Sequence, residues 1–488
     1  MLSLLLVAAA LRLWSIDAHS LWLDEAFSAI AAARPLPEML EMLRHDSAQP
    51  FYHLILHYWI GWGGMAETHL VRLSVIVGLM LVGLVYGIGT ADFSRPAGLY
   101  AGLLVALSPI HLFYSRQVRM YGLLAVVSVA AMVALERACE RGRWRDWLGY
   151  GMLAVMAMYT HLYGLFVPLI AAVFVWLRRR DRAAVRAALY CHLGILAVYT
   201  PWLPSLWYQV SGHQTPHLDR TTLLDVGRSF YYFSFGQPLS VAATSHPIRW
   251  MLSLIFSGLL VLGLHAVWRR RPAWVLFLIL PLSLGYLISF VTPVYFSGRY
   301  DMMVFPVWAL LVAAGLTAVK PLILQRVIGL TAIGLTLWPL SLYLRAVAHD
   351  APRNDIADLI VKQGKEGDIV ILTGLSRPPI QYYLDKVGQR VIMHSYPRGL
   401  EQHIAWIDRA HLTAHPDALV QDAEALIAHV EQELRPDGRV WLVYSHPDVS
   451  DPLRRRLDAR MAMTVAARQG ELSYPVFVYR KKRVTSGQ

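Results

Sequence analysis

Long apolar runs dominate the first 345 residues of the chain. A helix needs roughly 17 to 25 predominantly apolar residues to cross the hydrocarbon core of a bilayer. The pattern therefore predicts a polytopic α-helical membrane domain over residues 1–345, with about 11 transmembrane helices. We expect these helices near residues 1–16, 69–90, 97–114, 121–138, 147–162, 163–177, 187–206, 248–268, 273–292, 302–319 and 327–345.

The loops between these runs differ in their content of basic residues. Alternate loops hold most of the Lys and Arg residues, notably the arginine-rich segments 137–145, 178–186 and 269–271. Such loops stay on the cytoplasmic side. This predicts a cytoplasmic N-terminus and places the long segments 17–68 and 207–247 outside the cytoplasm.

Residues 350–488 have the residue pattern of a water-soluble domain. Two short β-rich runs, DIVILTG at 368–374 and GRVWLVYS at 438–445, are bounded by Gly or Asp. Residues 420–434 have helical periodicity and are followed by Pro-Asp-Gly. We expect a small C-terminal α/β domain, extracytoplasmic because it follows an odd number of spans.

Composition supports a membrane protein. Of 488 residues, 56% are hydrophobic and 16% charged, and the mean hydropathy is +0.42. The formal net charge of +12 comes almost entirely from the hydrophobic part, in short gaps between apolar runs. A nucleic-acid-binding protein would instead carry its Lys and Arg on a soluble face, so we expect membrane lipids and no nucleic acid as partners.

The segment SLWLDEAFSA, residues 20–29, places two carboxylates directly after the first apolar run. Asp24 and Glu25 would be costly against lipid, so they should face water, protein or a cavity. Taken alone, the pair has a simpler explanation, in which Asp24 caps a helix beginning at Ala26. The following segment, 35–62, has the proline and aromatic content of helices that lie at the membrane interface.

Three further external turns carry polar residues at the same predicted depth. Each turn alone is explained by interfacial anchoring or by a structural histidine. Together with the acidic pair, they have the composition expected of a site that binds an anionic lipid phosphate beside an ionisable base. The residues are Arg116, Arg119 and Tyr121 in the first turn, His161 and Tyr163 in the second, and Arg299, Tyr300 and Asp301 in the third.

The motifs in order resemble those of a known superfamily. LWLDEAF, the D-x-x-x-P-F-Y spacing at 46–52, YSRQVRMY, YTHLYG and SGRY followed by Pro306 resemble the polytopic GT-C glycosyltransferases. The resemblance is to the bacterial family 39-like proteins, which include protein O-mannosyltransferases, aminoarabinose transferases and the RgtA/B/C/D-like group. It covers about residues 1–345.

The resemblance implies an enzyme of the bacterial cytoplasmic membrane. Such an enzyme transfers a sugar from a polyprenyl-phosphate carrier to a glycan, glycolipid or protein acceptor outside the cytoplasm. Asp24 would act as the general base in an inverting displacement, and Glu25 would support the loop or orient the acceptor. The resemblance implies no particular cofactor and does not decide whether the enzyme uses a divalent metal.

The other candidate residues follow from the same resemblance. Donor phosphate and sugar would be bound by Arg116, Arg119, Tyr121, His161, Tyr163, Arg299 and Tyr300. Asp46, Tyr52 and His53 would support the first loop or the acceptor. Where relatives often have His-Pro-Pro, this chain has Ala48-Gln49-Pro50, which puts a histidine contribution there in doubt.

Two histidine patterns and two other functions compete with this interpretation. His53 and His57 are four residues apart, and the segment HQTPHLD at 213–219 offers His213, His217 and Asp219, but structural or solvated roles are favoured for both. A transporter or flippase of lipid-linked saccharides would need ionisable residues within its spans and paired broken helices. A ligase with a diphosphate-linked donor would share the chemistry without the acidic pair.

Overall fold

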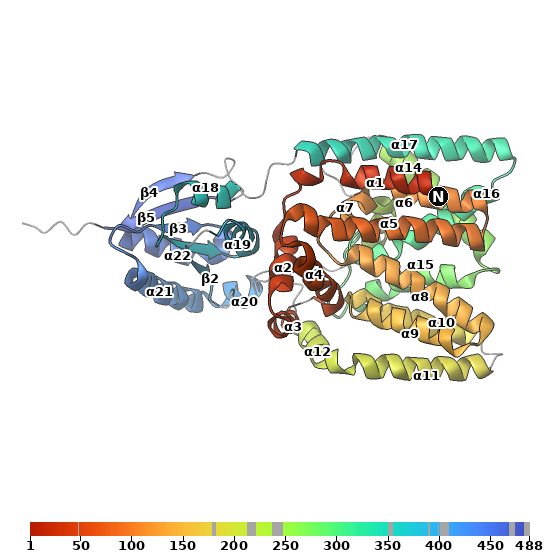
Figure 1. Ribbon diagram of the computed structural model, residues 1–488, viewed down its shortest axis with the longest axis horizontal. Coiled ribbons are helices and arrows are strands. Elements are labelled where there is room, and N and C mark those ends of the chain that lie inside the picture. The colour runs from red at the N-terminus through yellow and green to blue at the C-terminus, as the bar shows by residue number, and fades with distance from the viewer. Residues whose placement is uncertain are drawn as a thin grey trace, which may run out of the picture. The chain divides into compact units, whose positions relative to one another are not determined.

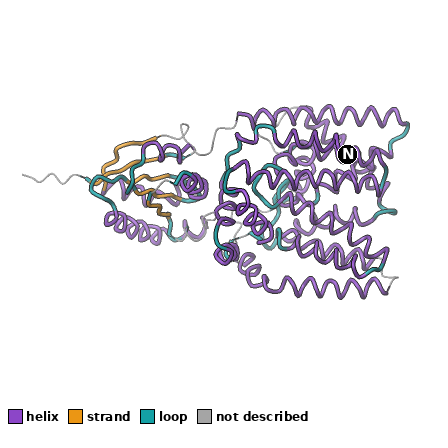
Figure 2. Tube along the Cα trace, in the orientation of Figure 1, coloured by secondary structure: helices purple, strands orange, loops and turns teal. Residues whose placement is uncertain are grey.

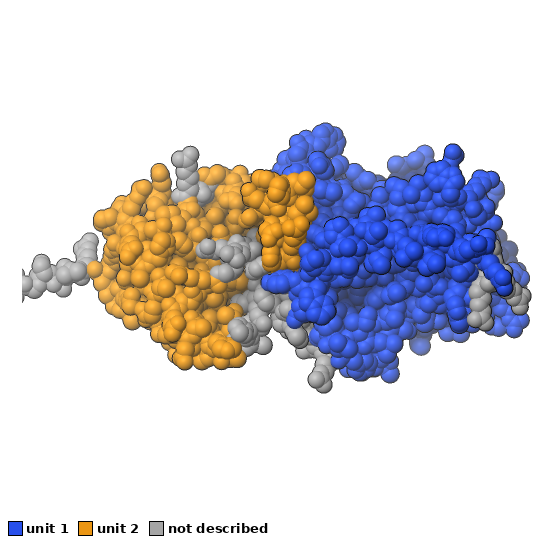
Figure 3. All heavy atoms as spheres, turned by 90° about the horizontal axis from the view of Figure 1, so that it is seen from below, with its two compact units in different colours: residues 1–18, 48–350 blue, residues 19–47, 351–488 orange. Residues whose placement is uncertain are grey.

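The computed structural model describes most of the chain. The described residues are 1–46, 48–177, 182–211, 221–236, 247–349, 355–388, 391–398, 400, 409–467 and 474–482. They form two compact units (Figure 3). The first unit contains residues 1–18 and 48–350, and the second contains residues 19–47 and 351–488.

The described part of the first unit consists of helices joined by turns, and its long helices run roughly parallel to one another (Figure 1). Local signals in the sequence set several helix ends. Ser94 caps the helix of residues 95–107, where its hydroxyl accepts a hydrogen bond from the Ala97 N–H. Gly142, with φ of 63°, ends the helix of residues 121–141, as expected for a residue that tolerates the left-handed conformation.

The helices of this unit follow the predicted apolar runs. The run at 97–114 is broken at Ser108-Pro109, and a break at residues 159–161 separates the runs at 147–162 and 163–177. The α-helices are α1 (Leu2–Leu13), α4 (Pro50–Gly63), α5 (Glu67–Asp92), α6 (Arg95–Leu107), α7 (Pro109–Tyr114), α8 (Tyr121–Arg141), α9 (Trp144–Met158), α10 (Phe166–Leu177), α11 (Arg182–Tyr199), α12 (Leu203–Ser211), α13 (Leu223–Phe235), α14 (Pro247–Val267), α15 (Pro272–Ile288), α16 (Phe305–Ala318) and α17 (Leu322–His349). Short 3-10 turns include η1 (Ile16–Ala18), η2 (Leu162–Leu165) and η5 (Tyr300–Met303).

Membrane character is evident from the lengths of these helices. Among the described residues, five segments are long and apolar enough to cross a bilayer, and α6, α15, α16 and residues 162–177 are shorter apolar helices. The five are residues 67–92, 121–141, 182–211, 247–267 and 322–348. A mostly helical membrane fold is therefore confirmed, while the number of about 11 crossings stays a prediction.

A buried arginine joins three helices inside the first unit. The Arg12 guanidinium of α1 donates hydrogen bonds to the carbonyls of Ala106 and Val105 at the end of α6 and to Nδ1 of His111 in α7, at 3.2, 3.3 and 2.7 Å. A buried charge is tolerated when it is hydrogen-bonded in this way. Arg12 therefore ties α1 to the break between α6 and α7.

The second unit is built on a five-stranded sheet with the order β2-β1-β3-β5-β4. Figure 2 shows the strands gathered in this unit among helices. Strand β1 runs parallel to β2 and β3, whereas β5 runs antiparallel to β3 and β4. The strands are β1 (Ile369–Thr373), β2 (Ile392–Tyr396), β3 (Val440–Val443), β4 (Met461–Ala467) and β5 (Val476–Lys481).

Two helices bury one face of this sheet. Apolar residues of α21 (Pro416–Glu433) and α22 (Pro447–Arg460), such as Leu426, Val430 and Leu453, form a core with Ile369 and Ile371 of β1. The predicted β-rich runs became β1 and β3, and the predicted helix at 420–434 became the C-terminal part of α21. The small C-terminal α/β region is thus confirmed.

The segment that carries the acidic pair belongs to the second unit. Helices α2 (Leu23–Ala33) and α3 (Leu36–Arg44) lie in it, together with α18 (Asp355–Gln363), α19 (Arg377–Lys386) and α20 (Arg409–Ala414). Helix α2 packs against α19. The backbone N–H of Leu21 donates a hydrogen bond of 2.9 Å to the Tyr383 hydroxyl, which fixes the start of the segment to α19.

Candidate functional site

Three turns of the first unit, far apart in the sequence, meet at one place. They contribute Arg119 and Tyr121, then His161 and Tyr163, then Arg299 and Tyr300. We call these six residues the arginine–tyrosine cluster. The structure therefore brings together six of the seven residues that the sequence suggested for donor binding.

Tyr121 is the centre of the cluster. It is the first residue of α8 and is buried. Its hydroxyl accepts a hydrogen bond of 2.7 Å from Nε of Arg299, and its ring lies 5.4 Å from the Arg299 guanidinium and 5.8 Å from that of Arg119. Both cations thus lie at the distance of a cation–π contact from one aromatic ring.

The second turn supplies rings that pack against the third. The His161 ring lies 4.9 Å from Tyr300 and 5.7 Å from Tyr121, and Tyr163 lies 6.2 Å from Tyr300. Nδ1 of His161 accepts a hydrogen bond from the Tyr163 N–H. That bond leaves the ring proton of a neutral His161 on Nε2.

Asp301 lies directly after the two cluster residues of the third turn. It is fully buried, and neither carboxylate oxygen makes a well-aligned hydrogen bond within the described part of the chain. Burial raises the pKa of Asp301 to about 7, although the Ser229 hydroxyl and nearby backbone N–H groups act in the opposite direction. The sequence shows Asp301 in the third turn, but it carries no signal of its burial, which depends on tertiary packing.

Arg116 is engaged elsewhere. Its guanidinium is buried and donates hydrogen bonds to the backbone carbonyls of Trp14 and Ser15, which follow α1. Those carbonyls lie beyond the last turn of the helix, where cationic donors are favourable. Arg116 and Arg119 are thus three residues apart in one turn, with different partners.

His53 of helix α4 lies near Arg119 of the arginine–tyrosine cluster. His53 is buried, and its Nδ1 contacts the Gln49 carbonyl at 3.1 Å. Burial lowers the pKa of His53 to about 4, the Gln49 carbonyl opposes that shift, and the charge of Arg119 adds to it. His53 is therefore neutral at physiological pH and close enough to Arg119 to interact with it. The neighbouring Tyr52 is also buried, with its ring 5.7 Å from that of His53.

The altered motif at residues 48–50 has a structural role of its own. The side-chain amide nitrogen of Gln49 donates a hydrogen bond of 2.9 Å to Oε1 of Gln209, and the side-chain oxygen of Gln49 accepts one of 3.3 Å from the Tyr199 hydroxyl. This network links the start of α4 to α11 and α12.

The acidic pair opens α2 in the second unit. The N-cap of that helix is Trp22, so the alternative explanation, in which Asp24 caps a helix beginning at Ala26, was wrong. Glu25 is buried, accepts a hydrogen bond from the Trp22 N–H at 3.4 Å and pairs with Nε2 of His19 at 3.0 Å. Asp24 is half-buried in the first turn, where a carboxylate is favoured by the helix dipole.

Two remaining candidates are less informative. Asp46 is buried in the second unit, just after α3. His213, His217 and Asp219 lie outside the described residues.

The structure of this chain is similar to those of known membrane proteins. The crystal structure of ArnT from Cupriavidus metallidurans in the apo state matches with a TM-score of 0.67 at 16% identity, over 98% of this chain and 97% of that chain. The structure of the same protein bound to undecaprenyl phosphate matches with a TM-score of 0.65 at 15% identity, over 100% and 99%. The chain has the same overall fold as ArnT.

Two further comparisons extend this result. The structure of the archaeal oligosaccharyltransferase AglB from Archaeoglobus fulgidus, in complex with an inhibitory peptide and a dolichol-phosphate, matches with a TM-score of 0.51 at 12% identity, over 99% of this chain and 74% of that chain. The family model described as dolichyl-phosphate-mannose-protein mannosyltransferase matches residues 49–207. No curated protein sequence matches the chain.

Proposed function

We propose that the protein is a membrane glycosyltransferase that takes a sugar from a polyprenyl-phosphate carrier and transfers it to an extracytoplasmic acceptor. The observation that carries this proposal is the convergence of Arg119, Arg299, Tyr121 and Tyr300 within a helical membrane unit. The GT-C fold and the mannosyltransferase family match over residues 49–207 support the same reaction class.

The arginine–tyrosine cluster binds the phosphate of the donor. When the glycosidic bond breaks, the phosphate oxygen gains negative charge, and a site that stabilises this charge lowers the barrier. Arginine suits the task because its planar guanidinium can donate two hydrogen bonds to a phosphate group. The Tyr121 hydroxyl accepts a hydrogen bond of 2.7 Å from Nε of Arg299, which fixes the orientation of that guanidinium within the cluster.

Asp24 acts as the general base. It removes the proton from the acceptor hydroxyl as that oxygen attacks the anomeric carbon, and the reaction inverts the configuration there. The buried Glu25 is engaged with His19 and with the Trp22 N–H. Glu25 is therefore a positioning residue that fixes the first turn of α2, and Asp24, which is more exposed, carries the chemistry.

The same proposal includes the cellular location. The protein lies in the bacterial cytoplasmic membrane, with its N-terminus inside and the second unit on the outer side, where the acceptor is available. The distribution of Lys and Arg between alternate loops supports this orientation. Asp46 then supports the first loop, and Tyr52 and His53 support the acceptor.

A transporter of lipid-linked saccharides is less well supported. It would need ionisable residues inside its spans, whereas the candidate residues of this chain gather in turns at helix ends. Transfer and transport also differ in outcome, because only transfer breaks the bond between sugar and phosphate.

The decisive experiment replaces Asp24 by Asn in the full chain. Mass spectrometry of envelope glycans from a strain lacking the gene would first identify the acceptor. The purified protein in lipid nanodiscs should then release polyprenyl phosphate from its sugar-linked form, and Asp24→Asn should lose at least about 100-fold in rate, since a general base contributes 10²–10⁴-fold. Normal turnover by Asp24→Asn would remove Asp24 from the base role. Movement of intact lipid-linked sugar without cleavage would favour the transporter.

A further inference from the structure

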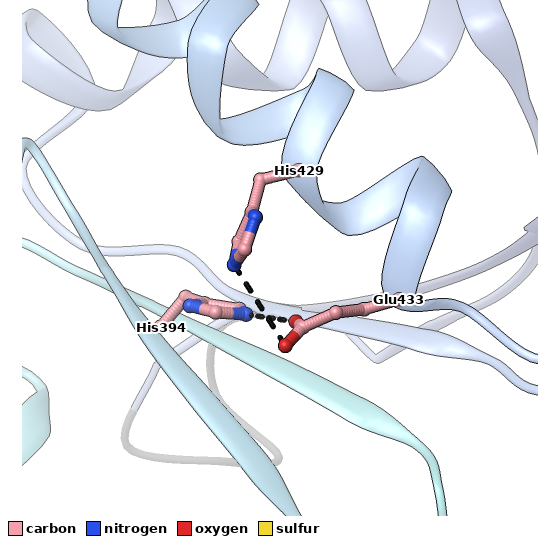
Figure 4. A group of neighbouring side chains, drawn as sticks. All are labelled: His394, His429 and Glu433. Carbon is pink, nitrogen blue, oxygen red and sulfur yellow. Dashed lines mark hydrogen bonds and ion pairs between the residues drawn. The ribbon is translucent and has the colours of Figure 1, made fainter.

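Three potential metal ligands meet on the second unit, and none of them has been given a role above. They are His394 in β2 and His429 and Glu433 in α21, and their ligand atoms all lie within 4.8 Å of one another. Figure 4 shows both histidine rings directed at the Glu433 carboxylate. Nε2 of His394 lies 2.7 Å from one of its oxygens, and Nε2 of His429 lies 3.7 Å from the other.

The secondary structure holds these three groups together. His429 and Glu433 are four residues apart in α21, so they project from the same face of the helix. His394 lies in the middle of β2, an edge strand that pairs only with β1, among the described strands. Because α21 packs along β2, the two elements present their ligands to each other without a change in backbone.

The charges around this cluster also favour a cation. Glu433 is the last residue of α21, where the partial negative charge of the helix terminus disfavours a carboxylate and favours a positive charge. A divalent ion between the three side chains would offset both the Glu433 carboxylate charge and the partial negative charge of the helix terminus. Two imidazoles and one carboxylate form a ligand set that Zn²⁺ uses with tetrahedral geometry.

The distances agree with such an ion. Metal–nitrogen and metal–oxygen bonds of 2.0–2.2 Å at tetrahedral angles separate two ligand atoms by about 3.3 Å. The observed 2.7 and 3.7 Å lie on either side of that value. Small side-chain rotations would suffice, and the exposed fractions of 51% for His429 and 34% for Glu433 leave the cluster open to solvent.

We propose that His394, His429 and Glu433 form a Zn²⁺ site that joins the C-terminal end of α21 to the edge strand β2. Water completes the coordination. The ion stabilises the second unit by adding a link between two elements that also meet through apolar packing, the His394–Glu433 pair and the hydrogen bond from the Tyr396 hydroxyl to the Leu419 carbonyl. This site is separate from the transfer reaction, and its existence does not depend on the proposed function.

The test uses the full-length protein in detergent, purified without a polyhistidine tag and freed of metal with EDTA. Isothermal titration with Zn²⁺ should show one saturable site, and Co²⁺ should give a visible absorption band that Zn²⁺ abolishes. His394→Ala, His429→Ala and Glu433→Gln should each weaken binding by at least about tenfold, since even an outer-shell partner contributes 10–100-fold. Zn²⁺ should also raise the Tm of the wild type and not that of the variants.

His415→Ala is the matched control. His415 is exposed and lies at the opposite end of α21, so its replacement should leave both Zn²⁺ affinity and the Co²⁺ band unchanged. If His394→Ala lowers the metal-free Tm, the conclusion rests on His429→Ala and Glu433→Gln, whose side chains are exposed. Wild-type affinity in these two variants, or no saturable binding by the wild type, would overturn the proposal.

Discussion

Nε of Arg299 donates a hydrogen bond of 2.7 Å to the hydroxyl of Tyr121. Arg299 precedes η5, whereas Tyr121 begins α8, so this bond joins two turns that are distant in the sequence. The bond fixes the orientation of the guanidinium through its Nε. The fork of Arg299 is thus positioned before any anionic ligand arrives.

Tyr121→Phe tests the value of that positioning. The variant keeps the ring against Arg119 and Arg299 but removes the oxygen that accepts from Nε. Hydrogen bonds to charged groups contribute about 1.5–3 kcal/mol, so kcat/KM for the lipid-linked donor should fall by about tenfold or more. Steady-state assays with donor in nanodiscs would measure this, with Tyr190→Phe, an exposed tyrosine on α11, as control. Equal kcat/KM in Tyr121→Phe and the wild type would contradict the positioning role.

Arg299→Lys tests whether the planar guanidinium contributes more to transfer than its positive charge alone. Lysine retains a cation but cannot donate two parallel hydrogen bonds to a phosphate. We expect kcat to fall by about 100-fold, while the donor KM changes less, because the phosphate gains its charge in the transition state. Arg228→Lys, in an exposed ion pair with Asp225, should leave kcat unchanged. A rise in KM alone would show that Arg299 contributes only to ground-state binding.

Arg116→Ala and Arg119→Ala should separate structure from catalysis. Arg116→Ala leaves the Trp14 and Ser15 carbonyls without their donor, which costs about 1–3 kcal/mol of stability and should lower the Tm. Arg119→Ala should keep a Tm near that of the wild type and lose transfer activity. Thermal unfolding and donor turnover, measured on the same preparations, would distinguish the two. The reverse assignment of effects would contradict our interpretation.

Asp301 should give the protein a stability that decreases as the pH rises. Its pKa in the folded protein is about 7, above the value of about 3.9 in an unfolded chain, so the folded state holds more protons between these two pH values. Stability is therefore fully present below about pH 4, falls as the pH rises towards 7, and levels off above it, with a total change of up to about 4 kcal/mol. Asp301→Asn mimics the neutral acid and should flatten this dependence.

The measurement is the Tm of the solubilised protein between pH 4.5 and 8. Asp225→Asn is a suitable control because the Thr222 and Arg228 hydrogen bonds lower the pKa of Asp225 despite its partial burial. Any stability that the Asp225 carboxylate contributes is lost only below pH 4.5. Asp225→Asn should therefore show the same change of Tm with pH as the wild type. A wild-type slope in Asp301→Asn would show that another group titrates.

The apolar runs of the sequence were sufficient to predict a helical membrane protein with a small C-terminal α/β region. The reason is that bilayer thickness and the need to satisfy backbone hydrogen bonds leave few alternatives for such runs. The motif order also indicated which turns carry polar residues. Alternation of β-rich and helical segments after residue 350 likewise predicted β1, β3 and α21.

Tertiary structure alone decided which of these residues meet. Arg116 and Arg119 lie in one turn, yet one contacts the carbonyls after α1 and the other contacts Tyr121. His394 lies far from His429 in the sequence, and only the packing of α21 on β2 makes them neighbours. Sequence periodicity indicates which face of a helix or strand is apolar. Whether two distant side chains are neighbours depends on how separate elements pack, and a local sequence pattern does not determine that packing.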